Sequence, residues 1–232
     1  MARLLAPVSR VLVALILASL PMRGPALAQE APAQSSQRRL WFDPTQLPRF
    51  TGTVERYLPA PAGGFDSLLL REGVQVLFPA EIGETLRQAV PQGRPIFVWG
   101  IRARSAPVIT MLAWAPTAEE EPRFVERPSW WAGTVTRGQT RISVQGTVRH
   151  TLHNSRGDVT GAMLDDGTVV RLPAEVAAAR HELLRPGARL AATGWGVEGE
   201  GARALSAETI GDSPQNMTPV PHAPEGAAPP RR

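Results

Sequence analysis

The chain contains no cysteine and no lysine, and it has a single tyrosine, Tyr57. Without cysteine it can form neither a disulfide framework nor a lipid-modified cysteine, and it has no thiol nucleophile. All 25 basic residues are therefore arginine. Because almost nothing titrates between histidine and arginine, the isoelectric point near 11.0 reflects missing buffering groups and does not indicate a nucleic-acid partner.

The first segment has the three parts of a secretion signal. Arg3 and Arg10 make a basic start, an apolar run follows over 11–20, and Ala26-Leu27-Ala28 is a small-x-small cleavage site. The apolar run is shorter than the roughly 20 residues that cross a bilayer, so a membrane anchor is the weaker interpretation. We expect residues 1–28 to be removed and the mature protein to be soluble, periplasmic or secreted, with no membrane span.

Removal of that signal leaves an almost neutral chain, with 22 arginines against 21 acidic residues. The next segment, 29–49, begins with Ala, Gln, Ser and Pro residues, a composition typical of a disordered spacer. It ends in an aromatic lead-in around Trp41 and Phe42, which we expect to pack against the domain that follows.

An internal repeat organises the rest of the chain. Residues 50–100 recur without a gap at 144–194, a shift of 94 positions. The matched residues are mainly turn and cap residues, such as Gly73 with Gly167. A repeat that keeps its turns while its apolar residues drift indicates a duplicated fold.

Each copy predicts three strands, a short helix and two further strands. In the first copy the tight turn at Gly73 joins strands two and three, and a proline, Pro79, starts the helix. This order is that of the OB-fold, a five-stranded barrel with a helix between strands three and four. An SH3-like barrel would lack the helix, and a solenoid would need at least three copies. We therefore predict an all-β chain with one short helix per repeat, forming two tandem OB-fold-like five-stranded barrels.

The predicted domain boundaries follow from the repeat. Repeat 1 covers 50–116, an acidic and proline-rich linker covers 117–128, and 129–211 holds an extra strand at 129–135 and repeat 2. The remaining 212–232, rich in proline and alanine, is predicted to be a disordered tail.

Alternation along the strands predicts which residues face each barrel core. On strand three of repeat 1, Gln75 and Leu77 should point outward, as should Val169 and Arg171 in repeat 2. Trp99 and Trp195 are interpreted as packing residues. The predicted core residues are Val54, Leu70, Val76 and Phe78 in repeat 1, and Val148, Leu164, Val170 and Leu172 in repeat 2.

The first copy carries the motifs Phe42-Asp43-Pro44-Thr45-Gln46-Leu47-Pro48 and Phe50-Thr51-Gly52-Thr53-Val54, and the second carries Gly157-Asp158, Asp166-Gly167-Thr168 and Pro186-Gly187. With these motifs both copies resemble a group of uncharacterised exported proteins of proteobacteria. The first copy departs from the pattern of that group at Arg71-Glu72-Gly73-Val74. The resemblance supports the fold and implies no activity.

Three patterns that could carry chemistry have simpler explanations. Residues 194–199 match a dinucleotide-binding pattern, but a strand rather than a helix follows, so no cofactor is predicted. The pair His150 and His153 lacks the further ligands that a metal site needs. Asp165 and Asp166 are adjacent and point to opposite faces of a strand, and the turn explains Asp166. With no serine in a nucleophile-elbow setting either, no catalytic residue is predicted.

A ligand-binding face is predicted in the second copy, where OB-folds usually bind: the outer side of strands two and three with its flanking loops. Three arginines and two histidines cluster on this face. The cluster suits an anionic polymer or the acidic face of a protein in the cell envelope, and binding of such a partner should strengthen as pH falls near roughly 6.5. The competing explanation, which we favour, is a solvated face balanced by Asp158, Asp165 and Asp166. The candidate ligand-binding residues are Arg149, His150, His153, Arg156 and Arg171.

The sequence therefore predicts a non-enzymatic exported binding or structural module. The alternatives are a single-stranded nucleic-acid-binding OB protein and an uncharacterised hydrolase. Nucleic acid is disfavoured, because few aromatic residues are expected on the outer strands and the mature chain has almost balanced charge.

Overall fold

The computed structural model describes residues 43–126, 139–199 and 202–221, all within one compact unit spanning Arg38–Arg232. The secretion signal, the spacer up to residue 42 and the extra strand predicted at 129–135 lie outside the described residues. Among the described residues, no helix is long and apolar enough to span a membrane.

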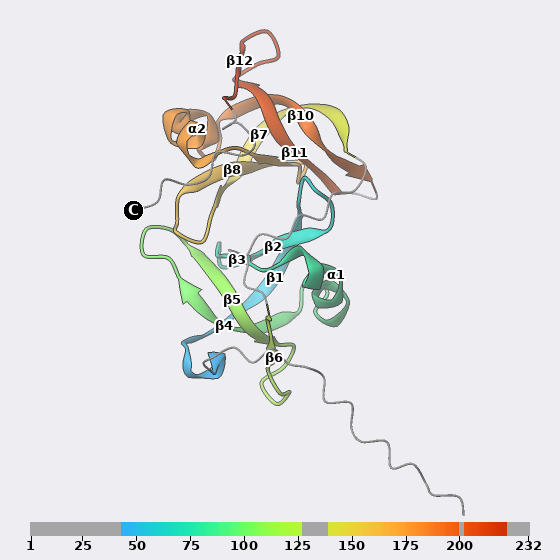
Figure 1. The fold of residues 1–232 in the computed structure, drawn as a ribbon, viewed down its shortest axis with the longest axis vertical. Coiled ribbons are helices and arrows are strands. Elements are labelled where there is room, and N and C mark those ends of the chain that lie inside the picture. Colours follow the sequence, from blue (N-terminus) through green and yellow to red (C-terminus); the bar gives the residue numbers. More distant parts are fainter. Residues whose placement is uncertain (1–42, 127–138, 200–201, 222–232) are drawn as a thin grey trace, which may run out of the picture. The chain divides into compact units, whose positions relative to one another are not determined.

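The first repeat forms a closed barrel (Figure 1). A short 3-10 helix, η1 (Pro44–Gln46), precedes it. Its elements are β1 (Arg49–Pro59), β2 (Phe65–Leu70), β3 (Gln75–Leu77), α1 (Ala80–Ala89), β4 (Pro95–Arg102), β5 (Val108–Ala115) and β6 (Arg123–Phe124).

The second repeat forms another barrel from the same sequence of elements. These are β7 (Thr140–His153), β8 (Val159–Leu164), β9 (Val169–Arg171), α2 (Ala174–Ala179), the 3-10 helix η2 (His181–Leu184), β10 (Arg189–Gly199), β11 (Ala202–Gly211) and β12 (Met217–Pro219).

Both barrels close in the order predicted from the sequence. Strand β1 pairs with β2 and β4, β2 with β3, and β4 with β5, while β3 closes the ring by pairing in parallel with β5. Strands β7, β8, β9, β10 and β11 repeat this arrangement. Each helix packs beside strand two of its own barrel, α1 against β2 and α2 against β8 (Figure 1). The predicted all-β architecture of two five-stranded barrels is confirmed.

The predicted core residues all lie in the two barrel interiors. Val54, Leu70, Val76 and Phe78 belong to one buried cluster, and their counterparts in repeat 2 belong to a second. The turns form as expected, because Gly73 and Gly167 adopt positive φ angles of 75° and 89° that favour glycine.

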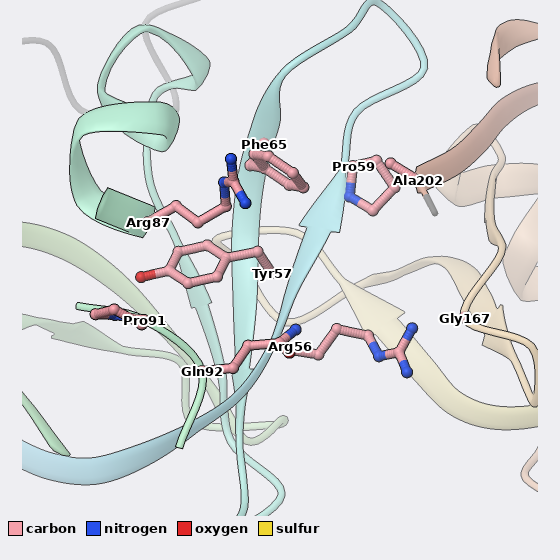
Figure 2. Close-up of a pocket in the computed structure, with 9 residues that line it drawn as sticks. All are labelled: Arg56, Tyr57, Pro59, Phe65, Arg87, Pro91, Gln92, Gly167 and Ala202. Atoms are coloured by element: carbon pink, nitrogen blue, oxygen red, sulfur yellow. The ribbon is translucent and has the colours of Figure 1, made fainter. Parts of the chain in front are cut away.

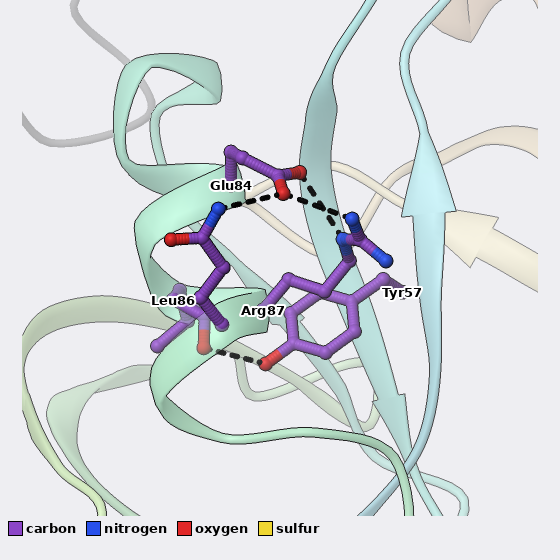
Figure 3. Close-up of polar contacts among 5 residues, drawn as sticks. Tyr57, Glu84, Leu86 and Arg87 are labelled. Atoms are coloured by element: carbon purple, nitrogen blue, oxygen red, sulfur yellow. Dashed lines mark hydrogen bonds and ion pairs between the residues drawn. The ribbon is translucent and has the colours of Figure 1, made fainter.

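One hydroxyl at the same repeat position ties each helix end to its barrel. The Tyr57 hydroxyl donates to the carbonyl oxygen of Leu86 at 3.2 Å (Figure 3). It also donates to the carbonyl oxygen of Val90 at 2.7 Å. In repeat 2 the Thr151 hydroxyl donates to the carbonyl of Leu184 at 2.7 Å. The last carbonyls of a helix often lack partners within it, and these bonds give the helix end additional acceptor contacts that fix it across the end of the barrel.

The predicted linker is not wholly solvated, which corrects that expectation. Arg123–Phe124 forms β6, which pairs with Ala113 and Trp114 of β5, and Val125 is buried in the first core. The physical reason is that β3 covers β5 only as far as Thr110, so the next backbone groups of β5 need another partner.

The start of the predicted disordered tail is also structured, for the same reason. Met217–Pro219 forms β12, which pairs with β11 from Thr209 to Gly211, beyond the part of β11 that β9 covers. Val220 is buried in the second core. The expectation of disorder was therefore wrong for the stretch up to residue 221, and 222–232 lies outside the described residues.

The lead-in and the tryptophans give mixed outcomes. Pro44 of the lead-in is buried and η1 contacts β4 and β5, as predicted for the described part. Trp195, interpreted as a packing residue, is instead 45% exposed, and its ring nitrogen donates to Glu208 at 2.8 Å. It lies outside because Gly194 and Gly196, on either side, turn toward the β11 backbone.

Candidate functional site

The outer faces of strands two and three, where OB-folds usually bind ligands, are covered in this protein. Gln75 and Val169 point away from their own barrel cores, as predicted, yet they are only 2% and 0% exposed. Val169 belongs to one buried cluster with Leu58 and Leu69 of the first barrel, and the Gln75 side-chain oxygen accepts the backbone N–H of His153 at 2.9 Å. Each barrel therefore covers the usual ligand face of the other, and we call this contact the seam.

An apolar cluster at the seam joins the two repeats. Two pairs of its members occupy equivalent repeat positions, Leu58 with Leu152 and Leu69 with Met163. A contact in which equivalent residues meet is isologous, like that of a two-fold symmetric dimer. The complete cluster is Leu58, Leu69, Leu152, Met163, Val169 and Ala204.

Polar pairs also cross the seam. The Arg171 guanidinium, with only 16% of its side chain exposed, donates to Asp66 at 2.9 Å and to the Ser67 hydroxyl at 3.2 Å. Glu55 and Arg149, which are repeat equivalents, form an ion pair. Both lie at shifts in strand register, the first between Val54 and Arg56 and the second at the matching place in β7. Such bulges re-aim side chains, and here they bring these two together.

The flanking loops meet as well. In the first loop of repeat 2, a β-carbon on Gly157 would overlap the Ser105 hydroxyl of the β4–β5 loop. Gly157 also has a positive φ of 92°. On the other side, the Gln139 side chain donates to the Pro61 carbonyl at 3.3 Å. The loops that would frame a ligand in an isolated OB-fold thus frame the other barrel.

The five candidate ligand-binding residues differ in their partners and exposure in the structure. Arg149 and Arg171 are paired with acids of the first barrel, while Arg156 pairs with its neighbour Asp158 at 3.0 Å and is 77% exposed. Only Arg156 among the three arginines is free of the seam. The prediction that Asp158, Asp165 and Asp166 balance these arginines is partly wrong. Glu55 and Asp66 of repeat 1 pair with two of the three arginines instead.

The surroundings of the two histidines favour the neutral form of each ring. Burial lowers the pKa of His153, and burial together with nearby Arg149 lowers the pKa of His150 against the opposing effect of Glu55. They therefore gain charge at a lower pH than an ordinary histidine side chain. This does not fit the expected strengthening of anion binding near pH 6.5.

Asp165 and Asp166 are occupied in the hairpin turn. The Asp166 carboxylate accepts the backbone N–H and the hydroxyl of Thr168 at 2.8 and 2.9 Å, and Asp165 accepts the backbone N–H of Asp166 at 3.1 Å. Across the described ranges, no group of three or more His, Cys, Asp or Glu side chains is placed to hold a metal ion.

One cleft of about 410 Å³ opens along the seam, and we call it the seam cleft (Figure 2). Two arginines line it, Arg56 from β1 and Arg87 from α1, and no aspartate or glutamate does among the described residues. Phe65 and the ring of Tyr57 form its apolar wall, and Gly167 of the second barrel lies opposite, against the Arg56 guanidinium. A ligand here would meet both barrels.

Sequence reasoning missed these cleft residues. Arg56 follows the predicted strand alternation without any motif, and its neighbour Gly167 belongs to the other repeat. Arg87 pairs with Glu84 one helical turn earlier, at 2.8 Å, and therefore looks like an ordinary exposed helix pair. Only the packing of the two barrels brings Gly167 of repeat 2 against Arg56.

Comparisons of the chain with protein-family models, with curated proteins and with solved structures found no match. The function proposed below therefore depends on the geometry of the two barrels and on the sequence.

Proposed function

We propose that the protein is a non-enzymatic exported binding or structural module of the cell envelope, in which the two OB-like barrels act as one body. The observation that carries this proposal is the mutual burial of the usual ligand faces at the seam, with Gln75 and Val169 almost fully covered. Export rests on the secretion signal read in residues 1–28.

The seam argues against the single-stranded nucleic-acid alternative. Such binding uses stacked aromatic rings and a basic groove on the outer face of strands two and three. Here that face is filled by Leu69 and Met163, and Arg171 is paired with Asp66. A nucleic acid could reach it only by separating the barrels, which would expose the whole apolar cluster.

Two measurements test the proposal. The mature chain, beginning near Gln29, should give no saturable change in fluorescence anisotropy with labelled oligothymidine at micromolar protein and moderate salt. Cell fractionation should find that chain in the periplasm or the medium, and a variant lacking residues 1–28 should stay in the cytoplasm. Saturable oligothymidine binding, or a full-length chain retained in the cytoplasm, would overturn the proposal.

A further inference from the structure

From the seam cleft we infer that this protein binds a small organic carboxylate, with Arg56 as the group that holds the carboxylate. This inference deepens the proposed function, on whose barrel arrangement it rests. It assigns a ligand class to the seam cleft, which is open and lined by two arginines (Figure 2).

Arg56 is the first observation. Its guanidinium lies against Gly167, where a β-carbon would overlap it, so this glycine leaves room for the planar group. Within the described part of the chain, Arg56 makes no ion pair and no hydrogen bond through its side chain. Its neighbour in sequence, Glu55, is committed to Arg149. A guanidinium in this state can offer two parallel N–H donors to a carboxylate.

The second observation is the charge of the cleft. Arg87 lines it too, and although Glu84 binds that guanidinium, none of the described residues that line the cleft itself is acidic. In the adjoining cavity, about 360 Å³, Glu198 is paired with Arg203, and the Asp166 carboxylate is held within its own turn by Thr168. The described residues that line the seam cleft carry positive charge only, which favours an anion.

The third observation is the apolar wall. Phe65 lies edge-on to Tyr57 with ring centroids 5.9 Å apart, and Arg87 lies 5.5 Å from the centroid of the Phe65 ring. The Tyr57 hydroxyl is bonded to two helix carbonyls, so the cleft meets its ring and not its polar end. A volume of about 410 Å³ lies within the range of small-ligand sites. A carboxylate on a ring or short apolar body fits this combination.

Binding is tested with benzoate as the probe and benzamide as its neutral match. In nitrogen-15 NMR spectra of the mature chain, benzoate should shift the backbone amides of Gln92 and Gly167 saturably, and benzamide should not at the same concentration. Equal shifts with benzamide, or no saturable shift with benzoate, would overturn the inference. Inorganic phosphate that bound these amides more tightly than benzoate would overturn the assignment to a carboxylate.

Three variants locate the site. Arg56→Gln should weaken benzoate binding at least about tenfold, because it removes the charged pair of donors. Gln92→Glu places an acid at an exposed position in the cleft, should fold normally and should also weaken binding, so the test stands even if Arg56→Gln does not fold. The control Arg185→Gln alters a surface arginine paired with Glu182 and should leave the affinity unchanged. Unchanged affinity in Gln92→Glu would contradict the site. If benzoate does not bind at all, the inference about the cleft fails. The proposed function is tested separately, by the measurements of oligothymidine binding and of export.

Discussion

Glu55 and Arg149 occupy equivalent positions of the two repeats, 94 residues apart, and they pair with each other across the seam. At an isologous contact, residues near the two-fold axis meet their own equivalents. A symmetric dimer of a single repeat would therefore bring two identical charges together at this point. The tandem chain carries opposite charges instead, which turns a repulsion into an attraction.

The first prediction concerns that pair. Arg149→Glu should destabilise the protein by about 0.5–1 kcal/mol, a small effect because 47% of the Arg149 side chain and 22% of that of Glu55 are exposed. Exchanging both charges, in Glu55→Arg with Arg149→Glu, should restore stability in urea denaturation. Combining Glu55→Arg with the distant Arg185→Glu should give only the sum of the single effects. Absence of rescue in the exchanged pair would contradict the contact.

The second prediction concerns the seam cluster. Leu69→Ala should cost about 2–5 kcal/mol although Leu69 lies outside both barrel cores, as should Leu164→Ala inside the second core. The exposed Ile101→Ala should stay within about 0.5 kcal/mol of the wild type. Denaturation midpoints measure all three. If Leu69→Ala behaved like Ile101→Ala, the barrels would be independent.

The third prediction is a loss of stability in mild acid. Burial lowers the folded-state pKa of His150 and His153 below the ordinary value of 6.5, so the unfolded chain binds protons first as pH falls. The stability that depends on the neutral form of these histidines is complete above pH 6.5 and is lost as pH falls through and below 6.5. The urea midpoint should thus decrease between about pH 7.5 and 5.5. The double variant His150→Gln with His153→Gln should show a smaller decrease, and an equal one would refute the assignment.

The fourth prediction separates crowding from backbone strain at two glycines. Gly187 has φ +88° and no atom within 4 Å of the position of a β-carbon, whereas at Gly161, φ +150°, that carbon would overlap the Val170 carbonyl. Gly187→Ala should cost about 1–2 kcal/mol from backbone strain alone. Gly161→Ala should cost clearly more, since β8 and β9 must also separate. Thermal melting compares them, and equal costs would show that the β8–β9 approach is looser than described.

The strand order and both cores could be predicted because they depend on local patterns. Alternation placed Val54 and Val148 inside, and the turn glycines Gly73 and Gly167 marked the hairpins. Strands β6 and β12 could not be predicted in this way. Each is only two or three residues long, too short to show alternation. Each forms because strand five extends beyond its parallel partner, which is a property of the closed barrel.

The seam left a signal in the sequence that alternation alone overlooks. Leu68, Leu69 and Leu70 run without a polar break in β2, as do Ala162, Met163 and Leu164 in β8. Continuous apolar runs are typical of strands covered on both faces. The seam cleft left no such signal, because Arg56 and Gly167 come from different repeats and meet only through packing.

The central claim, that each barrel covers the ligand face of the other, is tested most directly by thiol labelling. Because the chain has no cysteine, Met163→Cys introduces a single thiol at a seam position that is 1% exposed, and Thr51→Cys supplies an exposed control. In folded mature protein, labelling at 163 should be at least about a hundredfold slower than at 51, since the seam must open before the reagent enters. Equal labelling rates, with circular dichroism unchanged from the wild type, would contradict the account.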